Sequence, residues 1–386
     1  MSSTAHQGQR NLGIESYRCA QCGAQLVYQP GSTQLECPYC GHTTPIAPPA
    51  ATVEEIPLVF SDKSRLNLEL EEDRVVHCNS CAAEFSVGAD EVTQSCPFCG
   101  SNVVVEAEPK HRIMPNGMLP FYFKEAKGRE FLMKWLGSRF WAPNNLKQQA
   151  LKHGRLDGMY LPYWTYDSDT TTQYTGMRGD HYWETESYTD SNGNSRTRQV
   201  RRTAWSFAAG TVFVEFDDVL VLATDSVSEK HGQRLTNWDM HELVPYERQY
   251  LVGFHTLRYS RDLERCWGTA QQFMQPEIDD AIRYDIGGDE QRITTKNTNY
   301  EANTFKHLLL PVFAGSYRYG KKNYNFLVNG RTGEVQGDAP ISFWKVFFAV
   351  LLGLIIVGTI AYFYYQGEGS SSSRSSGSSF SNELPF

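Results

Sequence analysis

The stretch CAQCGAQLVYQPGSTQLECPYCG (residues 19–41) decides the fold of the N-terminal region. It holds two CxxC pairs separated by 14 residues, and the second pair closes as Cys-Pro-Tyr-Cys-Gly. A second stretch, CNSCAAEFSVGADEVTQSCPFCG (residues 78–100), repeats the pattern 59 positions later with the same 14-residue separation. These two stretches contain eight of the nine cysteines, so the cysteine content is organised as a tandem repeat.

Each CxxC pair lets one tight turn aim two thiolates at the same ion, and two pairs place four sulfurs around Zn²⁺ at about 2.3 Å. The spacing therefore predicts two zinc ribbons that hold two structural Zn²⁺ ions. Their ligands are Cys19, Cys22, Cys37 and Cys40 in the first ribbon and Cys78, Cys81, Cys96 and Cys99 in the second. Because the protein supplies all four ligands, no position stays open for a substrate. Iron in a rubredoxin-like centre remains an alternative to zinc.

Composition points to a β-rich protein that does not coat nucleic acid. The 386 residues carry a formal net charge of −8, and aromatic side chains make up 13% of them. Aromatic residues favour strands over a helical bundle. In both ribbons, the segment between the two CxxC pairs contains no Lys or Arg, which a phosphate-contacting surface needs. Nucleic-acid binding is therefore kept only as a second, less favoured hypothesis.

The apolar stretch at residues 343–365, FWKVFFAVLLGLIIVGTIAYFYY, predicts a single transmembrane helix. At about 1.5 Å per residue it spans roughly 34 Å, enough for a hydrocarbon core of about 30 Å. Trp344 at one end and Tyr362, Tyr364 and Tyr365 at the other are placed as interfacial anchors, and Lys345 can extend to the headgroups. Basic residues are more frequent before the helix than after it, which predicts cytoplasmic N-terminal domains and an external tail.

The sequence predicts an α+β protein with seven segments. They are a disordered leader (1–16), zinc ribbon one (17–46), a linker with a short strand (47–73), zinc ribbon two (74–108), a β-rich α+β domain (109–342), the transmembrane helix (343–365) and a Ser-rich disordered tail (366–386). The polar N-terminus lacks the apolar core of a secretory signal peptide. This absence favours reduced, metal-binding cysteines over disulfides.

Within the β-rich domain we expect two helices and several short strands. Helical spacing covers residues 124–141, and residues 260–283 form a helix that Pro276 interrupts. Residues 170–214 alternate around the polar turn 190–195, which predicts a hairpin. Short strands are expected between residues 308 and 336.

No catalytic motif is complete, so we predict that the protein is not an enzyme. Residues 315–322 approach a phosphate-binding loop, but Lys322 stands where that motif needs a hydroxyl, and a strand pattern follows instead of a helix. His241-Glu242 lacks the second histidine of a HExxH zinc site. Cys266, the ninth cysteine, is interpreted as a small buried hydrophobe.

The layout resembles bacterial membrane-anchored double-zinc-ribbon proteins of YdjG type, which are often labelled as related to primosomal protein N′ (replication factor Y). The resemblance is carried by CPYCG and CPFCG, by YLPYW (160–164), by LPVF (310–313) and by YNFLVNGRTGEV (324–335) before the anchor. It implies a place beside SPFH-domain and PspA-type envelope-stress proteins, where such a protein recruits a soluble SPFH partner to the membrane.

These observations lead to two hypotheses. The first is a non-enzymatic adaptor at the inner (plasma) membrane, in contact with lipid, that recruits an SPFH-domain protein and other membrane-stress proteins at the cytoplasmic face. The second is a membrane-tethered, replication-related protein that binds nucleic acid through its zinc ribbons.

Overall fold

The computed structural model describes residues 17–48, 52–59, 108–153, 155–191, 193–320 and 322–369, together with the backbone of four strands between residues 70 and 104. The predicted leader and the cysteines of the second ribbon lie outside these residues, as does the tail beyond residue 369. The chain divides into two compact units. The first comprises residues 1–132, 155–316 and 325–337, and the second comprises residues 133–154, 317–324 and 338–386.

Short strands dominate the N-terminal part of the chain, and long strands and helices dominate the rest. The N-terminal strands are β1 (Val27–Tyr28), β2 (Gln34–Glu36), β3 (Thr43–Pro45), β4 (Ile56–Pro57), β5 (Leu70–His77), β6 (Glu84–Ser86), β7 (Thr93–Ser95), β8 (Asn102–Val104), β9 (Glu108–Ile113) and β10 (Gly117–Met118). There follow α1 (Glu125–Ser138), α2 (Leu146–His153), β11 (Arg155–Thr189), β12 (Ser195–Leu222), α3 (Glu229–Gly232), η1 (Met240–Glu242), β13 (Val244–Pro245), η2 (Arg248–Leu251) and β14 (His255–Thr256). The C-terminal elements are α4 (Leu263–Ile286), β15 (Glu290–Tyr319), β16 (Lys322–Asn329), β17 (Val335–Gly337) and α5 (Phe343–Gly369).

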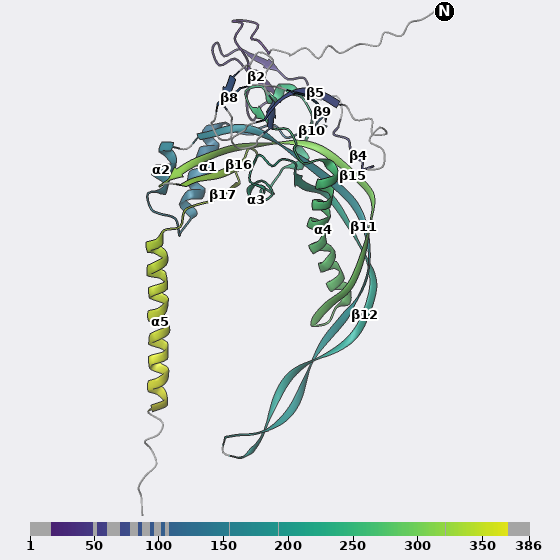
Figure 1. Ribbon diagram of the computed structural model, residues 1–386, viewed down its shortest axis with the longest axis vertical. Coiled ribbons are helices and arrows are strands. Elements are labelled where there is room, and N and C mark those ends of the chain that lie inside the picture. The colour runs from purple at the N-terminus through teal and green to yellow at the C-terminus, as the bar shows by residue number, and fades with distance from the viewer. Residues whose placement is uncertain are drawn as a thin grey trace, which may run out of the picture. The chain divides into compact units, whose positions relative to one another are not determined.

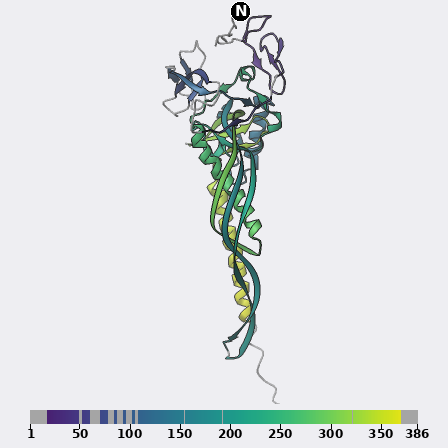
Figure 2. The same ribbon diagram turned by 90° about the vertical axis from the view of Figure 1, so that its right-hand side faces the viewer.

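Three very long antiparallel strands form the centre of the first unit. They lie in the order β12-β11-β15, and the short strands β10, β13, β14, β4, β16 and β17 extend the sheet at one end. Figure 1 shows the three strands curving together, and Figure 2 shows them side by side. The predicted hairpin is confirmed in kind but is much longer than expected, because pairing continues from Thr189 opposite Ser195 to Tyr163 opposite Leu222.

Both pairings of β11 are irregular at the level of Asp167 and Ser168, and the pairing with β15 shifts once more between Thr175 and Gly176. On one side β12 inserts an extra residue between Val219 and Phe216, and on the other β15 inserts one between Thr304 and Glu301. The inserted segments contain Asp218 and Ala302, which have positive φ angles of 53° and 50°. Bulges bend and twist the strand that carries them, so paired bulges give this sheet a defined bend.

Helix α4 covers the inner face of the bent sheet. Its buried residues recur at helical spacing and are Leu263, Cys266, Ala270, Met274, Ile278, Ile282 and Ile286. They pack with Trp164, Tyr166, Val212 and Phe216 of the long strands. The Asp262 carboxylate accepts the Arg265 N–H at 2.8 Å and caps the first turn. The expected interruption is wrong, since the helix runs through Pro276, whose exposed position leaves the buried stripe continuous.

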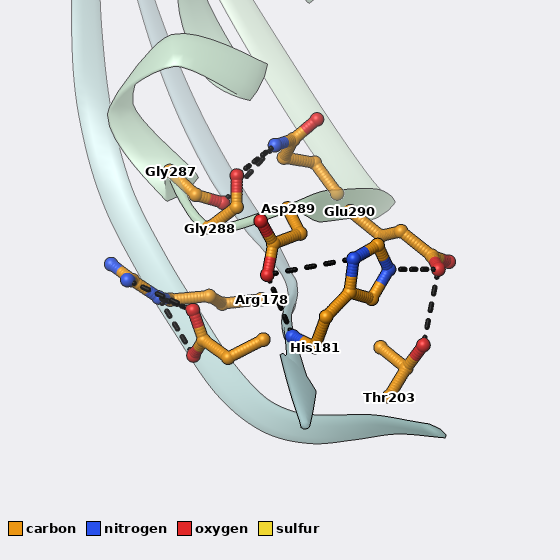
Figure 3. Close-up of polar contacts among 9 residues, drawn as sticks. Arg178, His181, Thr203, Gly287, Gly288, Asp289 and Glu290 are labelled. Atoms are coloured by element: carbon orange, nitrogen blue, oxygen red, sulfur yellow. Dashed lines mark hydrogen bonds and ion pairs between the residues drawn. The ribbon is translucent and has the colours of Figure 1, made fainter. Parts of the chain in front are cut away.

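A polar cluster fixes the point where β15 begins, just after α4 (Figure 3). His181 of β11 lies between two carboxylates, with Nε2 at 2.9 Å from Glu290 Oε1 and its backbone N–H donating to Asp289. Thr203 of β12 donates to the same Glu290 oxygen at 3.1 Å. One glutamate therefore joins all three strands, and beyond it the hairpin continues as two strands.

A second apolar cluster lies toward the other end of the sheet. It combines Leu119, Met159, Leu161 and Tyr163 with Leu308, Leu310 and Val312 of β15, and Trp238 covers it. The expected short strands within residues 308–319 are instead the end of β15. The near-match to a phosphate-binding loop falls on β15 and the turn between β15 and β16, not at the start of a helix.

The second unit is smaller and contains α2 and α5. The Arg139 guanidinium stacks on the Trp135 ring at 4.4 Å, and Tyr317 and Tyr324 stack at 5.6 Å across the β15–β16 turn. Residues 343–362 of α5 form the one helix, among those the structure describes, that is long and apolar enough to span a membrane.

Candidate metal centre

Two equivalent backbone turns carry the first cysteine set. In one turn the Gly23 N–H donates to Cys19 O and the Cys19 N–H donates to Ala24 O, at 2.9 and 2.7 Å. In the other, the Gly41 N–H donates to Cys37 O and the Cys37 N–H donates to His42 O, at 2.9 and 2.8 Å. Gly23 and Gly41 have φ angles of 75° and 73°, a conformation that residues with a Cβ rarely adopt. The CxxCG pattern thus builds the same turn twice.

The two turns bring four sulfurs together. Cys19 Sγ lies 3.5 Å from Cys40 Sγ, and Cys22 Sγ lies 3.5 Å from Cys37 Sγ. All four sulfurs lie within 4.8 Å of one another. A tetrahedral zinc with bonds of about 2.3 Å requires sulfur separations of about 3.8 Å. The cluster could therefore hold a metal ion with little adjustment, as the sequence predicts for Cys19, Cys22, Cys37 and Cys40.

The cysteine environments favour a bound cation. The backbone N–H groups of Cys40 and Tyr39 donate to the Cys37 sulfur and lower its pKa to about 6. For Cys40 the His42 N–H also lowers the pKa, but burial and the neighbouring sulfurs of Cys19 and Cys37 outweigh it and raise the pKa to about 12. Four adjacent thiolates repel one another, so a metal cation is needed to ionise all of them together.

Tyr28 and Gly31 tie this ribbon to two segments of the same unit, one after β10 and one at η2. The Tyr28 N–H donates to Val252 O at 2.9 Å, its hydroxyl lies 3.2 Å from Phe121 O, and its ring meets Tyr250 at 5.1 Å. The Gly31 N–H donates to Phe121 O at 2.9 Å, and a Cβ at Gly31 would lie 2.6 Å from Tyr122 O. No local sequence pattern predicts these contacts, although Pro30-Gly31 is a turn signal.

The ligands of the second set, Cys78, Cys81, Cys96 and Cys99, lie outside the described residues, but the strands around them repeat the first ribbon. Strands β2 and β3 pair with Gln34 opposite Pro45, and β7 and β8 pair with Thr93 opposite Val104. The β7–β8 pairing therefore lies 59 positions after the β2–β3 pairing. In the same way, the pairing of His77 with Glu84 lies 59 positions after the bridge between Arg18 and Gln25. The duplication seen in the cysteines thus extends to strand register.

The expected membrane-anchor residues lie on α5. Trp344 and Tyr362 are exposed near the two ends of the apolar span, and Tyr364 and Tyr365 fall within the last turns of the helix. The Lys345 ammonium donates to the carbonyls of Phe140 and Ala142, at 3.0 and 2.7 Å. Phe140 and Trp141 are also exposed, so a second aromatic pair lies close to the start of the helix.

A group of carboxylates beside the double bulge is a weaker candidate for a cation site. Oxygen atoms of Glu55, Asp167 and Asp217 lie within 4.8 Å of one another. The buried Lys306 ammonium already lies 3.0 Å from Glu55 and 2.9 Å from Asp218. Burial alone would lower the pKa of Lys306, but its hydrogen bonds to Asp218 and Glu55 raise it instead. The lysine therefore supplies the positive charge that these carboxylates need.

Together these features define a β-rich α+β protein with a four-cysteine cluster near its N-terminus and one apolar helix near its C-terminus. The chain is similar to the uncharacterized protein YdjG of Bacillus subtilis (strain 168), with 25% identity over 342 residues, which cover 86% of this chain and 92% of that protein. This similarity supports the predicted YdjG-type resemblance. No protein-family model and no solved structure matches the chain.

Proposed function

We propose that the protein is a membrane-anchored, non-enzymatic adaptor. Two zinc ribbons and the β-rich domain recruit a protein partner at the cytoplasmic face of the inner (plasma) membrane, and the Ser-rich tail lies outside. The partner is an SPFH-domain protein, and the process is the envelope-stress response that the YdjG-type resemblance implies.

The observation that carries this proposal is the closed four-sulfur cluster. If Cys19, Cys22, Cys37 and Cys40 bind one Zn²⁺, the tetrahedral shell is complete and the ion has a structural role. The matching register of β2–β3 and β7–β8 supports a second Zn²⁺ held in the same way. Because Tyr28 fixes the first ribbon to the segment after β10, a metal in the ribbon would also hold this part of the first unit in place.

The arginines of the hairpin support a protein partner over nucleic acid. Arg196 pairs with Asp190 at 2.8 Å, and Arg198 pairs with Glu186 at 3.1 Å. Arg202 pairs with Glu184 at 2.6 Å and also contacts Glu186. Three of the four arginines in this run are thus neutralised within the hairpin, whereas a phosphate-binding surface needs several free cations.

Crosslinking and mass spectrometry of the native membrane complex test the proposal. We expect crosslinks from the first unit to an SPFH-domain protein in membranes that contain the full chain. Cys37→Ser removes one zinc ligand and should abolish these crosslinks. Cys266→Ser, which changes a buried cysteine of α4, should retain them.

A titration with labelled single-stranded DNA at low salt separates the two hypotheses. The adaptor proposal predicts a flat titration with the full chain in detergent. Salt-sensitive DNA binding that Cys37→Ser abolishes would favour the nucleic-acid hypothesis. Absence of any crosslinked SPFH-domain protein under mild conditions would contradict the adaptor proposal.

A further inference from the structure

Strand β12 leaves a long backbone edge open. Its described partner is β11 on one side, and no described strand pairs with its other side. Near the core this edge is capped, because the Gln233 side chain donates to Leu220 O at 2.6 Å and accepts the Leu222 N–H at 3.0 Å. Among the described residues, no side chain caps the backbone of residues 203–216 in this way. This part of the edge can therefore pair with another strand.

The pairing of β12 with β11 shows which backbone N–H and C=O groups of β12 point away from β11. The Asp190 N–H donates to Asn194 O at the end of the hairpin, and the Thr170 hydroxyl donates to Val214 O. Even-numbered residues between these points therefore face β11, since positions alternate in an antiparallel pair. Odd-numbered residues from 203 to 215 direct their backbone groups away from the sheet.

This edge lacks the charges that usually protect exposed strands. Residues 203–216, TAWSFAAGTVFVEF, contain Glu215 as their single charged residue and no proline. No described strand pairs with residues 290–301 of β15 on the side away from β11, and this edge contains Glu290, Arg292, Lys296 and Glu301. Charged side chains discourage edge-to-edge pairing, so of the two edges β12 is the one suited to pairing.

Two exposed phenylalanines on the outer face of this segment lie at equal distances along the chain from Gly210. Phe207 and Phe213 lie three residues to either side of it, and they are 72% and 76% exposed. Val212 and Phe216 point to the opposite face, where they pack with α4. In an antiparallel pairing of two copies about Gly210, Phe207 of each copy faces Phe213 of the other, and Ala209 faces Thr211.

Charge is complementary in the same register. Glu215 has no ion pair among the described residues, and it would face Trp205 of the second copy. The Arg292 guanidinium lies over the Trp205 ring at 3.9 Å. The carboxylate of one copy would therefore approach a cation of the other, once on each side of the symmetry axis. Cross-strand aromatic pairs and opposite charges both stabilise a sheet.

We propose that two copies of this chain associate through their β12 edges, antiparallel and centred on Gly210. The three long strands of each copy then form one continuous six-stranded sheet. The interface is isologous and closes after two copies, so it yields a dimer and not a filament. This inference is independent of the adaptor proposal.

Charge substitutions at the two phenylalanines test the register. The full chain in detergent should sediment as a dimer. Phe207→Lys together with Phe213→Lys places two lysines opposite each other at both pairs and should convert it to a monomer. Phe207→Lys with Phe213→Glu places opposite charges at both pairs and should restore the dimer. Positions 207 and 213 are six residues apart on one strand, so this rescue cannot arise within a single chain.

Mixing two variants separates repulsion from misfolding. The double-lysine variant and the matching double-glutamate variant should each be monomeric alone and should form a heterodimer when combined. A monomeric wild-type chain at micromolar concentration would overturn the proposal. A double-lysine variant that is still a dimer would also overturn it. So would a monomeric variant that carries Phe207→Lys with Phe213→Glu.

Discussion

At the scale of single residues, the cysteines of the first cluster predict how metal binding depends on pH. At pH 7 Cys37, whose pKa is lowered to about 6 by backbone N–H groups, is already a thiolate. Cys40 stays protonated, because burial and neighbouring sulfurs outweigh the His42 N–H and raise its pKa to about 12. Zinc must displace that proton, so we expect the zinc affinity to rise about tenfold per pH unit for each proton released. Chelator competition between pH 6.5 and 8.5 measures this slope.

Matched serine variants provide the control for this prediction. Cys40→Ser should lower the zinc content by one ion per chain. Cys266→Ser should leave the zinc content unchanged, because Cys266 is buried on the face of α4 that packs against the sheet and its pKa is raised to about 12 by burial. An affinity that does not change with pH, or equal zinc loss in both variants, would contradict this account of the site.

The first ligand set was predictable because a CxxC turn is a local structure. Four residues and one glycine determine where its two sulfurs point, and the repeat supplies the other two. Tyr28 and Lys306 were not predictable. Tyr28 bonds to Phe121, 93 positions away, and Lys306 bonds to Glu55, 251 positions away. No local pattern encodes such partners, so residue type and spacing say little about these two roles.

At the scale of elements, the buried stripe of α4 should dominate the stability of the bent sheet. Ile278 is fully buried between Met274 and Ile282 and faces the long strands. Ile278→Ala removes this packing and should lower the free energy of unfolding by about 2–5 kcal/mol. Thermal unfolding followed by circular dichroism in detergent measures the shift.

Tyr284 on the same helix is the control. It is 91% exposed, so Tyr284→Ala should change the free energy of unfolding by no more than about 0.5 kcal/mol. Equal shifts from both substitutions would mean that the contacts of α4 with the sheet contribute little to stability.

Sequence patterns predicted which elements exist better than where they end. The i, i+4 spacing of apolar residues predicted α4, but Pro276 also predicted an interruption. The helix continues because Pro276 is exposed, so water can hydrogen-bond the backbone carbonyl that proline leaves without its helical partner. Residues 308–336 were predicted as short strands because Gly and Asn normally mark turns. In β15 such residues are held extended by pairing with β11. Pairing partners are non-local, and so strand length could not be read from the sequence.

At the scale of the whole molecule, the cysteine cluster and the apolar helix place different demands on the chain. The cluster needs deprotonated thiols in a reducing environment, whereas α5 presents apolar side chains that are exposed on every side over residues 343–362. A protein with its ribbons in the cytoplasm and α5 in the bilayer satisfies both demands. Whether the protein is anchored in a membrane therefore depends on whether α5 inserts into the bilayer.

Charge placed in the middle of α5 tests this assignment. The wild-type chain should stay with membranes after extraction with alkaline carbonate. Leu354→Asp combined with Ile356→Asp should move it to the soluble fraction, because each aspartate near the helix centre costs about 2.5–3.5 kcal/mol on insertion. Leu354→Ala with Ile356→Ala shortens the same side chains without charge and should remain membrane-bound. Extraction of the wild-type chain by carbonate would show that the helix does not span the bilayer and would remove the membrane from the adaptor proposal.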